Sequence, residues 1–210
     1  MRLYDYWRSS AAYRVRIALN LKGLTYEQVP VNLCQGNQRT LDYLARNAQG
    51  LVPTLEEGDV RLSQSLAIVE WLDETHPKPP LLPGTPLARA EVRSLAQLIA
   101  CDIHPLNNLR VLQYLEHRFG LGERHRIAWY RHWIGEGFNA LERRLAATAG
   151  RFSHGDAVTL ADVCLVPQVY NARRYQVDLG GYPTIRRIDA ACLELPAFEE
   201  ARPERQADAG

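Results

Sequence analysis

Four prolines lie within nine residues at 78–86 (KPPLLPGTP), and no other feature restricts the fold of this 210-residue chain so strongly. Proline has a fixed φ and no backbone N–H, which excludes this stretch from a helix interior and from a central strand. Short strand-like and helix-like stretches precede it, and long helical patterns follow it. We therefore expect two domains, 1–78 and 87–210, joined by a linker at 79–86.

The two predicted domains differ in their secondary structure. The first domain reads as α/β in the order β-α-β-α-β-β-α. Glycine-containing breaks near 120–122, 150–155 and 180–183 divide the rest into helices, so the second domain is expected to be all-α. Apolar periodicity is lost after Leu195, which predicts a tail that is loose or merely draped over the rest. The expected strands are 2–6, 26–31, 52–55 and 60–62, and the expected first-domain helices are 11–21, 39–46 and 64–75.

Composition excludes several classes of partner. The 25 basic and 24 acidic side chains give a net charge of +1, which offers no general attraction to nucleic acid or to an anionic membrane. There is no secretory start and no apolar run of the ~20 residues that span a bilayer, so a cytoplasmic protein is expected. The four cysteines lack CxxC spacing and the six histidines lack HExxH, so we expect reduced core cysteines and no metal.

The first candidate site lies where the first strand meets the first helix, at Trp7-Arg8-Ser9-Ser10-Ala11. Free backbone N–H groups and the positive end of the helix dipole meet at a helix start, so an anion would be stabilised there. The same field would acidify a bound thiol. The alternative is that Ser9 or Ser10 simply caps the helix.

Two further candidates lie in the first domain. Val52-Pro53 leads into a strand, where a cis X-Pro bond and an exposed backbone would pair with a peptide-like ligand. Gln64-Ser65 opens the 64–75 helix and offers a second anion site, or again only a cap. In the second domain, Thr159 and Asp162 match a capping box, which we interpret as structural.

Arginines supply the remaining candidates: Arg8, Arg110 and the pair Arg173-Arg174. A guanidinium binds a carboxylate through two parallel hydrogen bonds, so three arginines in one cleft would suit a dicarboxylate. The alternative is that they are solvated surface residues, which is the usual situation of arginine.

The string WRSSAAYRVRIALNLKG resembles the signature of the zeta-class glutathione transferases, and the resemblance continues through LVPTL, QSLAIVEWL, TLADVCLVPQV, NARRYQVDL and YPTI. It covers nearly the whole chain up to the tail. It implies a thioredoxin-like N-terminal domain, an all-α C-terminal domain, a homodimer and glutathione as cofactor.

The resemblance also implies residue roles in glutathione binding. Ser9 matches the serine that activates the glutathione thiol, with Ser10 beside it, whereas Ala11 replaces the motif cysteine and removes a possible auxiliary thiol. Val52 with Pro53 would hold the cysteinyl backbone of glutathione. Its γ-glutamyl carboxylate would be bound by Gln64 and Ser65, and its remaining polar groups would be contacted by Gln38, His104 and Asn108.

For the substrate, the resemblance implies a cis-configured keto-dicarboxylate, because the zeta class includes isomerases of maleylacetoacetate and maleylpyruvate. Arg174 matches a substrate-binding arginine of both groups, and Arg110 resembles the maleylpyruvate enzymes, so we favour maleylpyruvate slightly. Arg8 would help to orient the carboxylates. Two other functions remain open: a transferase or dehalogenase acting on small electrophiles, and a non-catalytic binding module.

Overall fold

The computed structural model describes residues 1–209, which divide into two compact units. One unit contains residues 1–81 together with the chain end from 193, and the other contains residues 82–192. The break after Leu81 falls inside the proline-rich stretch 79–86. No helix among the described residues is both long enough and apolar enough to cross a membrane.

The first unit is built on a four-stranded sheet with the strand order β2-β1-β3-β4. The strands are β1 (Arg2–Asp5), β2 (Glu27–Pro30), β3 (Thr54–Glu57) and β4 (Val60–Ser63). Strand β1 runs parallel to β2 and antiparallel to β3, which forms a hairpin with β4. The helices are α1 (Ser10–Leu21), the short 3-10 helix η1 (Asn37–Arg39), α2 (Leu41–Arg46) and α3 (Ser65–Thr75).

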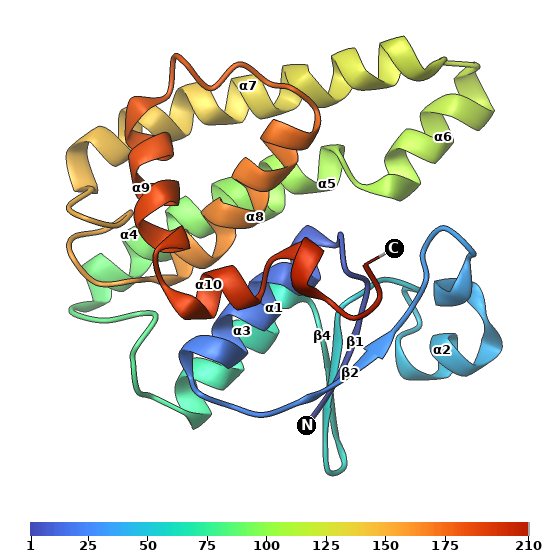
Figure 1. Ribbon diagram of the computed structural model, residues 1–210, viewed down its shortest axis with the longest axis horizontal. Helices are drawn as coiled ribbons and strands as arrows, with labels where there is room; N and C mark the ends of the chain where they lie inside the picture. The colour runs from blue at the N-terminus through green and yellow to red at the C-terminus, as the bar shows by residue number, and fades with distance from the viewer. Residues whose placement is uncertain (210) are drawn as a thin grey trace. The chain divides into compact units, whose positions relative to one another are not determined.

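The expected order β-α-β-α-β-β-α is confirmed. In Figure 1, α1 and α3 lie side by side on one face of the sheet and α2 lies on the other. Helix α1 is buried along most of its length because its apolar residues, among them Val15, Ile17 and Leu19, pack in the core between sheet and helices.

The end of the chain differs from the loose tail expected after Leu195. Helix α10 (Pro196–Glu200) and the 3-10 helix η3 (Pro203–Arg205) pack on the first unit, with Phe198 and Ala201 fully buried. Arg16 on α1 donates to the Ala201 carbonyl at 3.0 Å and forms a fully buried ion pair with Asp5 at 2.7 Å. The tail is ordered because Phe198 and Ala201 are buried in the unit and because the buried Arg16 side chain takes one of its acceptors from the tail.

The second unit is all-helical in its named elements, as predicted. Helix α4 (Pro86–Gln97) continues through a π-helical turn, η2 (Leu98–Ile103), into α5 (His104–Leu106). The long helix α7 (Glu123–Thr148) is connected to α6 (Leu109–Phe119) by a short glycine-containing turn, and α9 (Pro183–Leu193) closes the unit. Helix α8 (Leu160–Arg174) is buried along nearly its whole length and forms the centre of the core (Figure 1).

Two sequence interpretations can be judged within this fold. The predicted capping box is present at the start of α8, where Asp162 accepts hydrogen bonds from the Thr159 amide at 2.8 Å and hydroxyl at 2.9 Å. The expectation that every cysteine lies in the core is wrong for Cys34 and Cys101, which are exposed. Cys34 lies in a polar stretch, whereas Cys101 lies among mostly apolar residues, and the absence of CxxC spacing carried no information about burial.

Candidate functional site

Three of the predicted segments meet at one end of the sheet. The register pairs Tyr4 of β1 with Thr54 of β3, and Thr54 with Ser63 of β4. The end of β1, the start of β3 and the end of β4 are therefore neighbours. Consequently Arg8 and Ser9, which follow β1, lie at the same end of the sheet as Val52-Pro53 and Gln64-Ser65.

Ser9 is the N-cap of α1, and its hydroxyl oxygen accepts a hydrogen bond from the Ala12 amide at 3.2 Å. The interpretation of Ser9 as a helix cap is therefore correct. A hydroxyl that accepts from the helix still has its own proton to donate, and Ser9 is only partly buried. Ser10, the first helical residue, is 5% exposed, which leaves Ser9 as the more accessible of the two serines.

Arg8 lies in an aromatic setting next to the cap. Its guanidinium is 4.6 Å from the centre of the Trp7 ring and donates to the Tyr6 hydroxyl at 3.0 Å. Burial opposes the charge on Arg8, but Tyr6 and then Cys34 outweigh it and raise the pKa of the guanidinium. Among residues 1–209, Nε of Arg8 is buried without a hydrogen-bond partner. A charged group with an unused buried donor is suited to an anionic ligand.

The Val52-Pro53 peptide bond is cis, and the segment before it is tightly held. The carbonyl of Leu51 accepts from the Tyr43 hydroxyl at 2.7 Å and from the Asn47 side chain at 2.8 Å. Gly50 has φ +60°, and a Cβ there would lie 2.8 Å from the backbone oxygen of Gln38. Only glycine allows this close approach of Gln38 to the segment that leads to Val52.

Gln38 is partly buried, and its Oε1 atom is buried without a hydrogen-bond partner in the described chain. A buried acceptor of this kind fits a ligand that brings N–H donors. Glutathione carries two peptide N–H groups and an ammonium group, so the donor and acceptor chemistry of the site agrees with the expected cofactor.

Gln64 and Ser65 form the start of α3. Gln64 has φ +71°, a conformation that side chains other than glycine rarely adopt and that occurs preferentially at functional sites. Ser65 is 6% exposed, and its hydroxyl oxygen accepts from Nη1 of Arg14 at 3.1 Å. The fully buried guanidinium of Arg14 adds positive charge behind a helix N-terminus, which favours a carboxylate there.

Three of the predicted site residues lie around α5 and the start of α6 in the second unit. His104 is partly buried at the start of α5, and Asn108 caps α6 by accepting from the Arg110 amide at 3.1 Å. Arg110 itself is exposed. Helix α7 holds this turn through Trp129, whose indole N–H donates to the Leu106 carbonyl at 2.8 Å.

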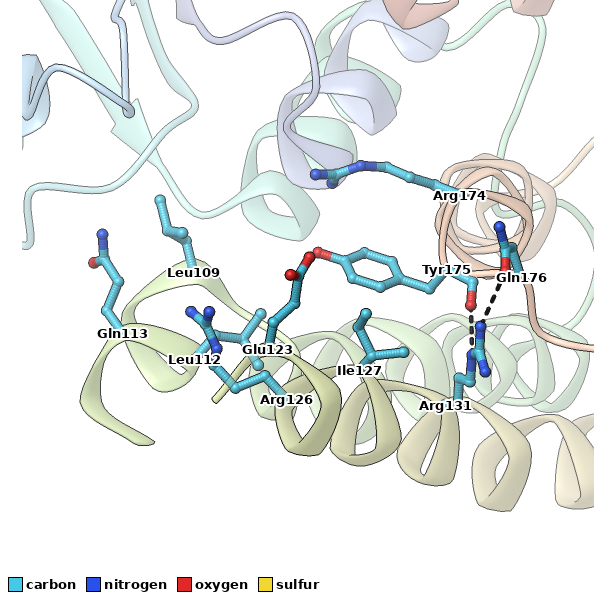
Figure 2. A pocket seen from close by; sticks show the side chains of 10 residues that line it. All are labelled: Leu109, Leu112, Gln113, Glu123, Arg126, Ile127, Arg131, Arg174, Tyr175 and Gln176. Atoms are coloured by element: carbon cyan, nitrogen blue, oxygen red, sulfur yellow. Dashed lines mark hydrogen bonds between the residues drawn. The ribbon is translucent and has the colours of Figure 1, made fainter. Parts of the chain in front are cut away.

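Arg174 lines a cavity of about 410 Å³ within the second unit (Figure 2). Its neighbour Arg173 forms an ion pair with Asp189 at 2.6 Å, whereas the side chain of Arg174 has no hydrogen bond or ion pair within residues 1–209. Its guanidinium lies 5.0 Å from the centre of the Tyr175 ring. The lining residues are Leu109, Leu112, Gln113, Glu123, Arg126, Ile127, Arg131, Arg174, Tyr175 and Gln176.

The cavity has an apolar wall and several guanidinium groups, but they differ in availability. Arg126 is paired with Glu116, and Arg131 donates to the end of α8. This leaves Arg174 as the cationic lining residue without an acceptor in the described chain. Arg110 is not among the lining residues, although it follows Leu109, which is.

Sequence reasoning missed Arg14 and Arg131. Arg14 stands in the helical run RVRIAL, which is apolar except for Arg14 and Arg16, and a charged residue on a buried helix face is a usable signal of a special partner. Arg131 lies in a helix with many charged residues, and nothing in the sequence distinguishes it from its neighbours.

Comparison with known proteins adds independent information. Residues 1–74 match the family model "Glutathione S-transferase, N-terminal domain", and residues 134–204 match "Glutathione S-transferase, C-terminal domain". A probable maleylacetoacetate isomerase of Vibrio cholerae is 52% identical, over 99% of this chain and 97% of that protein.

Two solved structures are similar over their whole length. A bacterial zeta-class maleylpyruvate isomerase in its holo form is 50% identical with a TM-score of 0.98, covering 100% of both chains. A maleylacetoacetate isomerase of Methylobacterium extorquens AM1 with bound malonate and glutathione is 46% identical with a TM-score of 0.97, also covering 100% of both chains. The chain therefore belongs to the glutathione transferase family, and within it to the zeta class.

Proposed function

We propose that this enzyme is a glutathione-dependent cis-trans isomerase of a maleyl keto-dicarboxylate. One observation carries the proposal. A partly buried serine hydroxyl at the start of α1 shares an end of the sheet with two segments suited to a peptide-like, carboxylated ligand. When bound, glutathione supplies a thiolate that adds reversibly to the cis double bond and so permits rotation.

The residues of the first unit hold glutathione in this proposal. The Ser9 hydroxyl donates to the thiolate, and the N-terminal field of α1 lowers the pKa of the thiol. The backbone of Val52 pairs with the cysteinyl part, and Gln64 with Ser65 binds the γ-glutamyl carboxylate. Gln38 accepts from a ligand N–H through its unpartnered Oε1. His104 and Asn108 are proposed to bind its remaining polar groups.

The substrate is recognised through its carboxylates. Arg8 and Arg174 each keep unused donors in the described chain, which supports their proposed part in orienting a dicarboxylate. Arg110 is proposed as the third such arginine, and its presence favours maleylpyruvate over maleylacetoacetate. We also propose a homodimer in the cytoplasm, where the free state of all four cysteines is expected to persist.

A direct test follows each cis substrate by ultraviolet absorbance with glutathione present at a small fraction of the substrate concentration. Isomerisation converts all of the substrate and leaves the free thiol concentration unchanged. A conjugating transferase instead stops when glutathione is consumed. Conversion that ends at the amount of glutathione added, with an equal loss of free thiol, would replace the isomerase by a transferase, and failure to bind immobilised glutathione would favour a non-catalytic module.

A further inference from the structure

Helix α8, whose last turn carries Arg174, ends in a common motif that has an unusual residue at its key position. The amide of Gln176 donates to the Arg173 carbonyl and that of Val177 to the Ala172 carbonyl, both at 2.9 Å. This pair of bonds is the Schellman arrangement, in which the residue at the position of Gln176 must take positive φ. That position is usually glycine, yet here Gln176 adopts φ +54°.

Arg131 on α7 contacts this strained end directly. Its Nε donates to the Tyr175 carbonyl at 2.7 Å, and its Nη2 donates to the side-chain oxygen of Gln176 at 3.3 Å (Figure 2). A glycine at position 176 would relieve the strain but would offer no acceptor to Nη2. One guanidinium from α7 thus fixes two consecutive residues beyond the end of α8.

The contacts continue from Tyr175 to Arg174. The Tyr175 ring stacks on Tyr130 of α7, with ring centres 3.6 Å apart and an angle of 16° between the planes. The Arg174 guanidinium lies 5.0 Å from the centre of the same Tyr175 ring. Figure 2 shows the Arg174 side chain running above that ring, on the side away from Arg131. Tyr130 therefore holds the ring of Tyr175, and Arg131 holds its carbonyl. Tyr175 in turn supports the guanidinium of Arg174.

The Tyr130 ring of this stack is buried. Burial first, and Tyr175 second, raise the pKa of the Tyr130 hydroxyl. The cation of Arg174 lies over the Tyr175 ring, an attraction that is weak at exposed sites. That attraction alone is too small to immobilise a long exposed side chain, which loses much rotamer entropy when it is fixed.

We propose that Arg131 is a positioning residue for substrate binding: by fixing the end of α8 it sets the place of the Arg174 guanidinium over the cavity. The inference rests on the proposed role of Arg174 in binding a substrate carboxylate. Arg131 donates to Tyr175 and Gln176 through Nε and Nη2, so the proposal has it act through Arg174, and the double variant below distinguishes this from direct binding of the carboxylate by Arg131.

The test combines single and double variants: Arg131→Ala, Arg131→Lys, Arg174→Ala and Arg131→Ala with Arg174→Ala. Arg143→Ala is the matched control, because Arg143 also lies on α7 and its Nε also donates to a backbone carbonyl, that of Asn139 at 3.0 Å. Four quantities are measured with saturating glutathione: KM and kcat for the cis dicarboxylate, kcat/KM for a neutral electrophile, and the Kd of malonate. Thermal unfolding of each variant verifies that it is folded.

We expect Arg131→Ala to raise KM and the malonate Kd about five- to tenfold with kcat nearly unchanged, which is the loss of roughly one hydrogen bond's contribution. Arg131→Lys should recover part of this, since lysine can still donate to the Tyr175 carbonyl. Turnover of the neutral electrophile should not change. In the Arg174→Ala background, Arg131→Ala should have no further effect.

Two outcomes would overturn the inference. The first is an equal loss of kcat/KM for the neutral electrophile, which would mean a general structural role. If Arg131→Ala does not fold, the same comparison is made with Arg131→Lys. The second is an undiminished effect of Arg131→Ala when Arg174 is already absent. Failure of the proposed function is separate: wild-type protein that binds malonate but isomerises neither cis substrate would refute the reaction and leave the positioning measurable through the malonate Kd.

Discussion

Ser9 combines two uses of one hydroxyl. Its oxygen accepts from the Ala12 amide and caps α1, while its proton remains available to a ligand at the end of the sheet. The sequence presented these uses as alternatives, since a serine before a helix is most often only a cap. The geometry makes them compatible, because capping requires an acceptor and thiolate binding requires a donor.

Variants of Ser9 can separate the two uses. Ser9→Ala removes both and should cost about 1 kcal/mol of unfolding free energy and at least about tenfold in kcat, equivalent to one unit in the pKa of the bound thiol. Ser9→Asp restores a capping acceptor but has no proton to donate and adds negative charge. It should therefore recover thermal stability without recovering kcat.

The measurements for this prediction are thermal unfolding, and kcat as a function of pH with saturating glutathione. The rising limb of the kcat profile should move to higher pH in both variants, because a thiolate that loses its donor forms less readily. Recovery of kcat in Ser9→Asp would show that the cap, and not the donated proton, matters.

At the scale of elements, the sequence was most informative where periodicity is strong. The order of the first unit and the helices on either side of the glycine breaks were predictable, because apolar spacing and helix-stopping residues are local signals. The π-helical turn at 98–103 and the positive φ of Gln64 and Gln176 were not. These depend on contacts with distant segments, such as that of Arg131 with Gln176, which no local pattern contains.

The start of α8 offers a prediction at this scale. Asp162 is fully buried and accepts from the Ser153 amide at 2.8 Å as well as from the amide and hydroxyl of Thr159. Asp162→Ala would leave three buried donors without an acceptor, so we expect a loss of about 3 kcal/mol or more and a fall in Tm of roughly 6–12 °C.

The matched control is Asp178→Ala, because the exposed Asp178 carboxylate accepts, within residues 1–209, only from the nearby Gly180 amide at 2.8 Å. It should change stability by no more than about 0.5 kcal/mol. Differential scanning calorimetry measures both variants. A Tm of Asp162→Ala equal to that of Asp178→Ala would show that the capping box is not needed for the stability of the helical unit.

At the scale of the whole molecule, both ends of the chain belong to one compact unit. The residues from 193 onward belong to the same unit as residues 1–81, and the helical unit lies between them in sequence. Helix α10 has only five residues and a single large apolar one, Phe198, so it is too short to show periodicity. The sequence therefore predicted a loose tail where the structure has a packed segment. Its partners, Arg16 among them, could not be assigned from residues so far apart.

Graded truncations test whether the chain end stabilises the first unit. Removing residues 207–210 takes away Asp208, which accepts from the Trp7 amide at 3.2 Å, and should lower Tm only slightly. Removing residues 195–210 also takes away buried Phe198 and the Ala201 carbonyl, so that Arg16 loses an acceptor next to its buried pair with Asp5. The longer truncation should lose the affinity for glutathione together with the stability of the unit.

A single substitution tests the role of the chain end without shortening the chain. Phe198→Ala should cost about 3–5 kcal/mol, the usual loss for a buried phenylalanine, whereas Leu41→Ala, at a side chain that is 88% exposed, should be nearly neutral. Thermal unfolding and glutathione affinity are measured for both. Because α10 packs on α1, whose first turn carries Ser9 and Ser10, the chain end stabilises the helix that is proposed to activate the thiol. Normal stability and glutathione binding in Phe198→Ala would show instead that α1 holds its place without the chain end.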